Sequence, residues 1–410
     1  MLTFTDAAGI LTSKLLYPQT TSRTRKESPM ITIYGKYTNA IVYTAASEEY
    51  AIDEYARKQL QMLCDHPSAA GSKIRVMPDV HPGKVSTIGL TMTVGSSLMP
   101  NLVGVDIGCG MTIAKLKSKN IEFQKLDTVI RENVPCGGKV RKTAHKLGRS
   151  FDIGKLYSYK STDSAKAALS IGTLGGGNHF IEVDKDEDGF LYLVIHSGSR
   201  HAGIEVTTHY LKKGQHEQQM KGSGGYAPYE LTCLSGSLLD EYLHDLAIMQ
   251  DFAAANREAM VDEITRGMKW RIEDCYSCIH NYVDFSGSTP VLRKGAIRAN
   301  AGEKVIIPVN MRDGVILGTG LGNEDWNCSA PHGAGRIYKR SEVKEHHTVS
   351  EFKKAMEGIH SVCINKDTLD ESPFAYRKID NITGVIGDTV KIDKILKPVY
   401  NLYSSVTIAV

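Results

Sequence analysis

Six side chains that can bind a metal or take part in catalysis lie on glycine-rich turns or at strand ends of this 410-residue chain. They are one carboxylate, one thiol and four imidazoles: Asp106, Cys109, His179, His196, His280 and His332. Oxygen, thiolate and imidazole donors together suit Mn, Zn or Fe. Any one of these residues alone is more often a capped core residue than a ligand, but one Asp, one Cys and three His could hold two adjacent divalent ions.

The local spacing of these residues supports a shared site. Asp106 and Cys109 lie three residues apart on a turn interrupted by glycines, so both side chains can face one ion. His179 follows three glycines and Asn178, and His196 stands at the end of an apolar run typical of a strand. A histidine that points from a strand end into a loop is well placed to act as a ligand or a base.

A second expected feature is a site for an anion. Cationic side chains are supplied by Arg200, Arg336, Lys339 and Arg340. The Gly-Ala-Gly segment 333–335 adds backbone N–H groups that no large side chain obstructs, and phosphate is the anion that fits such donors best. His332 directly precedes this segment, and from the residues alone it could be a ligand, a nucleophile or part of a turn.

Hydrophobic periodicity indicates the elements that position these groups. Strand-like runs begin at Met30 and recur at 73–77, 191–195, 305–309 and 314–317, and helical spacing covers 48–65 and 238–271. The second helical segment is long and interrupts the strands as an insertion. The pattern predicts a mixed α/β fold with one large domain over residues 30–410, many short strands, glycine-rich loops and a helical insertion.

The composition is that of a globular protein able to bury a full core, with 41% hydrophobic and 23% charged residues. The net charge of +3 is small for this length. A polyanionic partner must therefore be held by a local basic patch rather than by the field of the whole molecule. Residues 1–29 are polar, basic and weakly periodic, and we expect a flexible N-terminal extension there.

Cysteine usage and hydropathy bear on the compartment in which the protein works. Eight cysteines are spread thinly along the chain, unlike the dense disulfide frameworks of small secreted domains. No apolar run approaches the roughly 18 residues of a membrane span, and the N-terminus lacks the apolar core of a signal peptide. We therefore expect reduced cysteines, a cytoplasmic location and no membrane partner.

Taken in order, the motifs of this chain resemble those of the RtcB-type RNA ligase family. The likeness rests on segments 77–83, 105–111, 174–182, 196–200, 280–281 and 332–336, and it runs from about Met30 to the C-terminus. The resemblance implies one large α/β domain, two Mn²⁺ ions and GTP as cofactor. It also implies a reaction, the joining of an RNA 3′-phosphate or 2′,3′-cyclic phosphate to a 5′-hydroxyl in RNA repair or tRNA splicing, and it raises the possibility of an activating protein partner.

The resemblance also implies roles for individual residues. The metal ligands are Asp106, Cys109, His179, His196 and His280. His332 is the nucleophile that accepts GMP, and Asp79 orients its imidazole. The nucleotide is bound by Asn178, Phe180, Glu182, Asn310, Gly333, Ala334, Gly335 and Tyr403. RNA phosphates are bound by Arg200, Arg336 and Arg340.

Three positions depart from the family pattern. Tyr403 stands where a lysine normally contacts guanine, and Asn310 and Lys339 each replace a usual residue. Tyr403 can donate a hydrogen bond or stack on a base, but it cannot supply the positive charge of the lysine.

Two other functions are compatible with the same residues. A dinuclear metallohydrolase that opens cyclic phosphates or cleaves phosphomonoesters would use the metal ligands but would need neither GTP nor His332. A non-catalytic binder of RNA ends would hold a 3′-phosphate without forming a product. Activity that survives loss of His332 but not loss of Cys109 would indicate the hydrolase, and any sealed RNA would exclude the binder.

Overall fold

The computed structural model describes residues 30–44, 52–220 and 228–404. The predicted extension at 1–29 and the beginning of the predicted helix at 48–65 lie outside these ranges. The described part of the chain is mixed α/β, as its sequence predicts.

The elements fall close to the predicted ones. The helices are α1 (Glu54–Cys64), α2 (Pro100–Val103), α3 (Phe123–Asn133), α4 (Lys146–Ser150), α5 (Ser164–Ser170), α6 (Arg200–Met220), α7 (Gly236–Met268), α8 (Val343–His346), α9 (Val349–Ala355) and α10 (Ile379–Thr383). The strands before α6 are β1 (Met30–Tyr34), β2 (Asn39–Tyr43), β3 (Ile74–His81), β4 (Ile88–Thr93), β5 (Ser97–Leu98), β6 (Gly110–Leu116), β7 (Phe180–Lys185) and β8 (Leu191–Ser197). The later strands are β9 (Leu234–Ser235), β10 (Ile272–Ile279), β11 (Asn281–Asp284), β12 (Val291–Lys294), β13 (Ala296–Arg298), β14 (Lys304–Asn310), β15 (Gly314–Gly320), β16 (Ser329–Pro331), β17 (His360–Ser361) and β18 (Val390–Tyr403).

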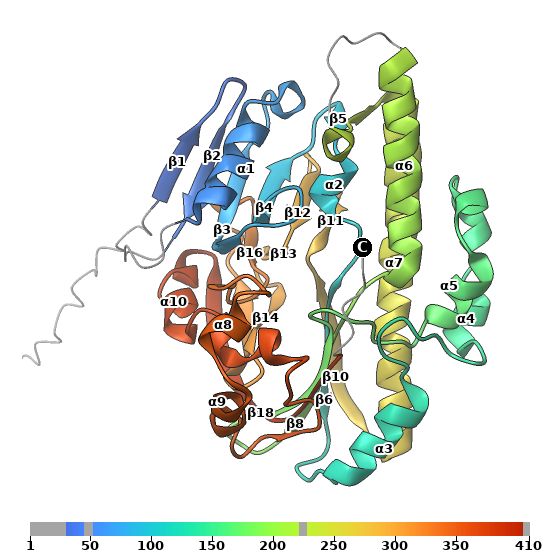
Figure 1. Cartoon of the computed structure of the whole chain (residues 1–410), viewed down its shortest axis with the longest axis vertical. Coiled ribbons are helices and arrows are strands. Elements are labelled where there is room, and N and C mark those ends of the chain that lie inside the picture. Colours follow the sequence, from blue (N-terminus) through green and yellow to red (C-terminus); the bar gives the residue numbers. More distant parts are fainter. Residues whose placement is uncertain (1–29, 45–51, 221–227, 405–410) are drawn as a thin grey trace, which may run out of the picture.

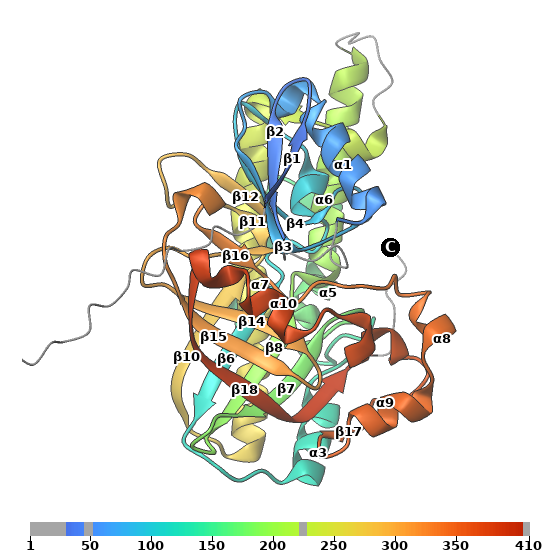
Figure 2. The ribbon, with the colours of Figure 1, turned by 90° about the vertical axis from the view of Figure 1, so that its left-hand side faces the viewer.

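Two large sheets organise the molecule. One has the strand order β1-β2-β3-β4-β12-β11, and the other has the order β10-β6-β8-β7-β18-β15-β14 with β17 beside β18. Two short pairs, β13-β16 and β5-β9, complete the described strands. Figures 1 and 2 show the six-stranded sheet above the eight-stranded sheet, and in Figure 1 helices α6 and α7 form a column along one side of both. The column ties the two sheets together.

The sequence of β8 is apolar at successive positions because both faces of this strand are covered. Its odd-numbered residues from Leu191 to Ile195 pack with α3 and α7, while Tyr192 and Val194 pack with β14 and β15. A strand covered on both faces needs apolar side chains at every position. His196 shares the face of Tyr192 and Val194, so the strand directs this imidazole to the side of the sheet away from α7.

Helix α7 is part of the core and is not a peripheral insertion. It packs against β6, β8, β11 and α3, and its buried residues include the polar side chains Asn256 and Arg257. The helix ends where Lys269 adopts a left-handed conformation at φ 58°. The predicted insertion is therefore a long structural helix behind the eight-stranded sheet.

All eight cysteines lie in the described ranges, and none of them forms a disulfide. Among the described residues, no helix combines the length and the apolar character needed to cross a bilayer.

Candidate functional site

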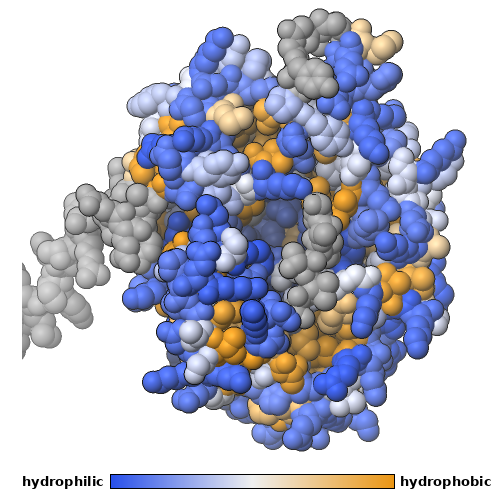
Figure 3. Space-filling view, in the orientation of Figure 1, coloured by the Kyte–Doolittle hydropathy of each residue, from blue (hydrophilic) through white to orange (hydrophobic). Residues whose placement is uncertain are grey.

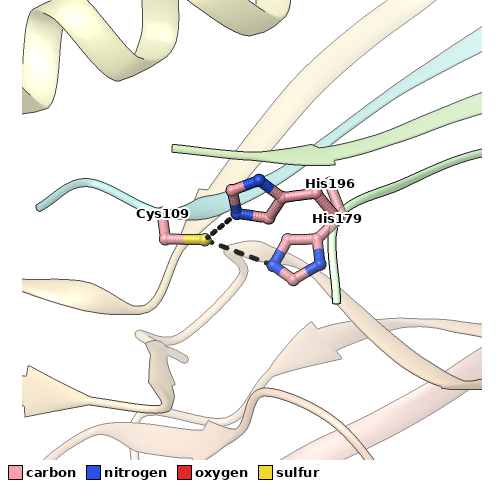
Figure 4. Close-up of side chains that lie close together, drawn as sticks. All are labelled: Cys109, His179 and His196. Atoms are coloured by element: carbon pink, nitrogen blue, oxygen red, sulfur yellow. Dashed lines mark hydrogen bonds between the residues drawn. The ribbon is translucent and has the colours of Figure 1, made fainter. Parts of the chain in front are cut away.

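Three of the predicted metal ligands lie within contact distance of one another. The Sγ atom of Cys109 is 3.5 Å from Nε2 of His179 and 3.3 Å from Nε2 of His196. All three side chains are buried. Cys109 directly precedes β6, His179 directly precedes β7 and His196 belongs to β8, so three neighbouring strands of one sheet bring the cluster together (Figure 4).

Backbone carbonyls hold the two imidazoles of this cluster in place. The Nδ1–H of His179 donates to the carbonyl of Leu174, and the Nδ1–H of His196 donates to the carbonyl of Asn178, each at 2.9 Å. These bonds place the proton on Nδ1 and leave the lone pair of Nε2 facing Cys109. Burial, with a smaller contribution from His179, lowers the pKa of His196 to about 3, so the ring is neutral as a metal ligand requires.

Asp106 and His280 extend the cluster at its two ends. Oδ2 of Asp106 lies 3.0 Å from Nε2 of His179, and Nε2 of His280 lies 3.4 Å from Nε2 of His196. Nδ1 of His280 has no hydrogen-bond partner among the described residues. The structure thus brings together all five ligands predicted from the sequence, in the spatial order Asp106, His179, Cys109, His196, His280.

The electrostatics of the cluster fit a divalent cation. Burial opposes the ionisation of Asp106, but when the His179 ring also carries a proton on Nε2, its hydrogen bond and charge outweigh burial and lower the pKa of the carboxyl group to about 2; a bound cation would take the place of that proton. Burial and the adjacent charge of Asp106 raise the pKa of the Cys109 thiol well above its usual value. A cation among a carboxylate, a thiol and neutral imidazoles would offset this repulsion and stabilise the thiolate.

Glycine at position 198 makes room for the Asp106 carboxylate. A Cβ atom on Gly198 would lie 2.2 Å from Oδ1 of Asp106, closer than two atoms can approach. The same oxygen accepts a hydrogen bond from the backbone N–H of Ser199 at 3.0 Å. The turn after β8 therefore fixes the orientation of Asp106.

Two residues of α7 support the site and were not singled out from the sequence. Asn256, fully buried, accepts from the N–H groups of Gly172 and Thr173 and donates to Gly198. Arg257, also fully buried, donates to the carbonyls of Gly108 and Ser197. The sequence feature that could have identified Asn256 and Arg257 is their position, as adjacent polar residues, on the apolar face of a long helix.

His332 lies next to this cluster with a different partner. Its Nδ1–H donates to Oδ2 of Asp79 at 2.7 Å, and its ring centre is 4.8 Å from that of His280. The side chain of Asp79 is fully buried, and its Oδ1 has no partner among the described residues. Asp79 comes from β3 of the six-stranded sheet and His332 directly follows β16, so two separate elements supply the pair.

A cavity of about 940 Å³ opens beside His332. Its lining includes His332, two of the predicted metal ligands, two of the predicted RNA-phosphate ligands and all eight residues predicted to bind the nucleotide: His196, His280, Arg336, Arg340, Asn178, Phe180, Glu182, Asn310, Gly333, Ala334, Gly335 and Tyr403. The volume is in the upper part of the range usual for small-molecule sites. Figure 3 shows that the face of Figure 1 is hollowed near its centre and that hydrophilic residues border the hollow.

One end of the cavity combines aromatic and acidic side chains. The rings of Phe180 and Tyr403 stack at 4.9 Å with an angle of 16° between their planes. Glu182 lies beside them and is only 1% exposed. Asn310 also lines the cavity, but its amide bonds Asp313 and caps the turn between β14 and β15.

The predicted phosphate ligands fall into two groups. Arg336 and Arg340 line the cavity, where Arg340 forms ion pairs with Asp370 and Glu371. Arg200 does not line it; its buried guanidinium donates to the carbonyl of Gly137 and to Thr173. The backbone N–H groups of residues 333–335 donate to no other described residue, so they are available to a phosphate.

Comparison with known proteins agrees with these observations. Residues 59–162 and 154–406 match the protein family described as tRNA-splicing ligase RtcB. The RNA-splicing ligase RtcB of Escherichia coli K12 is 32% identical over 388 residues, which cover 85% of this chain and 94% of that protein, and the RNA-splicing ligase RtcB1 of another Escherichia coli strain matches equally well. The tRNA-splicing ligase RtcB of Aeropyrum pernix is 28% identical over 403 residues, covering 76% of this chain and 83% of that protein.

Proposed function

The chain belongs to the RtcB family of tRNA-splicing ligases, and we propose from this premise that it is an RNA ligase that uses GTP and manganese. The ends it joins are an RNA 3′-phosphate, or a 2′,3′-cyclic phosphate, and a 5′-hydroxyl. The proposal places the reaction in RNA repair or tRNA splicing, with a cytoplasmic location and an activating protein partner as further expectations.

The observation that carries the proposal is the pairing of His332 with Asp79 at the edge of the five-donor cluster. A hydrolase built on the same ligands does not require an imidazole nucleophile in the cavity. A nucleophile that accepts a nucleotide needs both a fixed tautomer and an adjacent negative charge. The pair provides the two together, which favours a ligase over the metallohydrolase.

The five donors are proposed to hold two manganese ions. Cys109 lies in the middle of the donor series, with His179 and Asp106 on one side and His196 and His280 on the other. Imidazole, carboxylate and thiolate donors of this kind would suit manganese. When bound, such ions neutralise charge on the transferring phosphoryl group and on its leaving group.

His332 acts in the first step of the proposed reaction. The Asp79 carboxylate can only accept, so Nδ1 carries the proton and Nε2 keeps its lone pair. Nε2 attacks the α-phosphorus of GTP; the P–N bond forms as the bond to pyrophosphate breaks, and pyrophosphate leaves. Asp79 stabilises the positive charge that develops on the ring.

The RNA ends react in the next two steps. An oxygen of the RNA 3′-phosphate attacks the GMP phosphorus, the P–N bond breaks, and His332 returns to its neutral form. The 5′-hydroxyl oxygen then attacks the RNA 3′-phosphorus, a 3′–5′ phosphodiester forms, GMP leaves, and the hydroxyl proton passes to water. A cyclic phosphate is first hydrolysed to the 3′-phosphate.

The remaining cavity residues are assigned to binding. The stacked rings of Phe180 and Tyr403, with Glu182 beside them, are proposed to hold the base. Asn178 and the N–H groups of residues 333–335 are proposed to hold the nucleotide phosphates. Arg336 and Arg340 are proposed to hold RNA phosphates; the pairing of Arg340 with Asp370 and Glu371 means that RNA must compete with two carboxylates there. Arg200 is kept as a proposed RNA contact from the family resemblance alone, because its guanidinium does not line the cavity and bonds Gly137 and Thr173.

Covalent labelling tests the proposal. The purified protein incubated with Mn²⁺ and [α-³²P]GTP should gain an acid-labile label, and an RNA with a 3′-phosphate and a 5′-hydroxyl should be sealed with release of labelled GMP. An unlabelled wild-type protein with full metal occupancy would falsify the ligase proposal. Hydrolysis of cyclic phosphate that persists in the His332→Ala variant, without labelling of the wild type, would instead support the metallohydrolase.

A further inference from the structure

A strongly basic part of the chain has no role in the site described above. Residues 139–160, called here the basic segment, contain seven Lys or Arg and a single Asp, and none of them lines the cavity. Their net charge of +6 exceeds the +3 of the whole chain, so the remaining residues together are acidic. A local basic patch, which a polyanionic partner requires here, is therefore concentrated in this segment.

The basic segment lies on the outer side of the column formed by α6 and α7. It contains α4, which packs against α7, and Figure 1 shows α4 on the side of the column away from the two sheets. The segment is attached to α7 at two distant points: Arg141 pairs with Glu263, and the N–H of Tyr157 donates to Asp245. Since one helical residue rises 1.5 Å, these two attachments are about 27 Å apart along α7.

The start of the basic segment lies close to the metal-ligand cluster. Gly137, just before the segment, donates its N–H to the carbonyl of Gly175 at 2.7 Å, and its own carbonyl accepts from Arg200. Gly175 belongs to the glycine-rich loop that leads to His179. The basic segment therefore begins beside the loop that supplies a predicted metal ligand and leads away from it along α7.

Most of the cations in the basic segment are not neutralised by the protein. Arg141 and Lys146 pair with Glu263 and Asp262 of α7. The other five are exposed and form no ion pair with a described residue: Lys139, Lys142, Arg149, Lys155 and Lys160. A strip of unpaired cations favours binding of a polyanion, because the counterions that it displaces gain entropy on release.

Two tyrosines stand among these cations. Tyr157 and Tyr159 are 61% and 47% exposed, and Lys155 and Lys160 flank them in the sequence. The ammonium group of Lys160 lies 5.9 Å from the centre of the Tyr159 ring, and the Tyr157 ring lies 4.8 Å from that of His244. Exposed aromatic rings between cations are typical of surfaces that bind single-stranded nucleic acid, where the rings stack on bases and the cations bind phosphates.

A buried carboxylate holds the two tyrosines in place. Asp245 of α7 is fully buried and accepts from the N–H of Tyr157 at 2.8 Å, from the N–H of Ser158 at 2.9 Å and from the Ser158 hydroxyl at 2.7 Å. The hydroxyl of Tyr210 also donates to it, at 2.8 Å. The backbone between the two rings is thus fixed to the column, so the rings lose little conformational freedom when a ligand binds.

We propose that Lys155, Tyr157, Tyr159 and Lys160, called here the tyrosine–lysine surface, bind a single-stranded part of the RNA substrate away from the ends that react. Bases stack on the two rings, and the lysines bind phosphates together with the other unpaired cations of the basic segment. A duplex would hide the faces of its bases from the rings, so the strand must be unpaired. The inference rests on the proposed function, because it takes RNA to be the substrate.

The affinity for RNAs of two lengths tests the surface. Fluorescence anisotropy measures the binding of 3′-phosphorylated single strands of about 5 and about 25 nucleotides, without GTP, so that nothing is joined. We expect the wild type to bind the long strand more tightly than the short one. The double variant Tyr157→Ala/Tyr159→Ala should lose about tenfold or more of its affinity for the long strand and less than about twofold for the short strand. Tyr157→Phe/Tyr159→Phe keeps both rings and should bind as the wild type does.

Two further variants control for general effects of exposed tyrosines and of charge. Tyr34→Ala/Tyr37→Ala removes two exposed tyrosines beside Lys36, outside the basic segment, and should bind both strands as the wild type does. Lys155→Gln/Lys160→Gln removes two phosphate contacts, so the slope of log affinity against log salt concentration should become shallower by about 1.4 for the long strand. This measurement keeps the inference testable if the alanine variant does not fold.

The outcomes distinguish this inference from the proposed function, because labelling by [α-³²P]GTP and sealing of RNA are measured on the same preparations. If the wild type takes up no label and binds neither strand, the proposed function fails and the inference fails with it. If the wild type is labelled and seals RNA, but Tyr157→Ala/Tyr159→Ala binds the long strand with wild-type affinity, only the inference is overturned. An equal loss for both strand lengths, or an equal loss in Tyr34→Ala/Tyr37→Ala, would overturn it as well.

Discussion

The histidines of the site are held in two ways, and the difference separates a ligand from a nucleophile. His179 and His196 donate their Nδ1–H groups to backbone carbonyls, whereas His332 donates to the carboxylate of Asp79. A carbonyl fixes the tautomer and nothing more, which suits a neutral metal ligand. A carboxylate also stabilises positive charge on the ring, which suits an imidazole that must become cationic during phosphoryl transfer.

Exposure follows the same division. His179 and His196 are almost fully enclosed, while the side chain of His332 is 17% exposed, against 6% for that of His179, and faces the cavity. A resident ion gains from an enclosed site, and a group that reacts with an incoming nucleotide must be reachable. We therefore assign metal binding to His179 and His196 and nucleophilic attack to His332. Four substitutions test this assignment.

Replacement of His332 is expected to have the largest effect. His332→Ala removes the only atom proposed to accept GMP, so covalent labelling by [α-³²P]GTP should fall by about 10³-fold or more. The metal content, measured by mass spectrometry, should stay at the wild-type level because the five donors remain. Loss of manganese in this variant would contradict the division between the two kinds of histidine.

Replacement of Cys109 should give the converse result. Cys109→Ala removes the central donor of the cluster, and manganese affinity should fall by about 100-fold or more, with labelling lost as a consequence. Excess Mn²⁺ should restore part of the labelling in Cys109→Ala but none in His332→Ala. Equal rescue of both variants would contradict the assignment of Cys109 to metal binding and of His332 to nucleophilic attack.

Replacement of Asp79 should have an intermediate effect. Asp79→Asn can still accept from Nδ1 of His332 but no longer carries a charge, so the rate of labelling should fall by about 10²-fold while manganese binding is unchanged. The rate is measured in single-turnover experiments at saturating GTP. If the rate is unchanged, a neutral acceptor is sufficient and the carboxylate has no special role.

A methyl group near His332 should have the smallest effect. Gly295 has φ +62°, and a Cβ atom there would lie 3.1 Å from Cε1 of His332 and 2.1 Å from the side chain of Ile88. Gly295→Ala should therefore slow labelling severalfold by displacing the ring, without loss of metal. Gly302→Ala is the matched control: it has φ +79° with open space around the added atom, and should cost only about 1 kcal/mol of stability. Equal labelling rates in the two variants would show that the position of the ring tolerates the displacement.

The amino-acid sequence alone determined much of the fold and the site. The apolar run of β8 and the helical spacing of α7 were readable because hydrophobic periodicity is a local property. The glycine-rich segments that carry Asp106, Cys109 and His179 pointed to close approach of backbone and ligand. The residue types of a metal site were likewise evident before any distance was known.

Only the tertiary structure decided which groups meet and which do not. Asp79 and His332 are 253 residues apart and come from different elements, so no local pattern joins them. Only the structure shows that Arg200 bonds Gly137 and Thr173 and that Asn310 lines the cavity while its amide bonds Asp313.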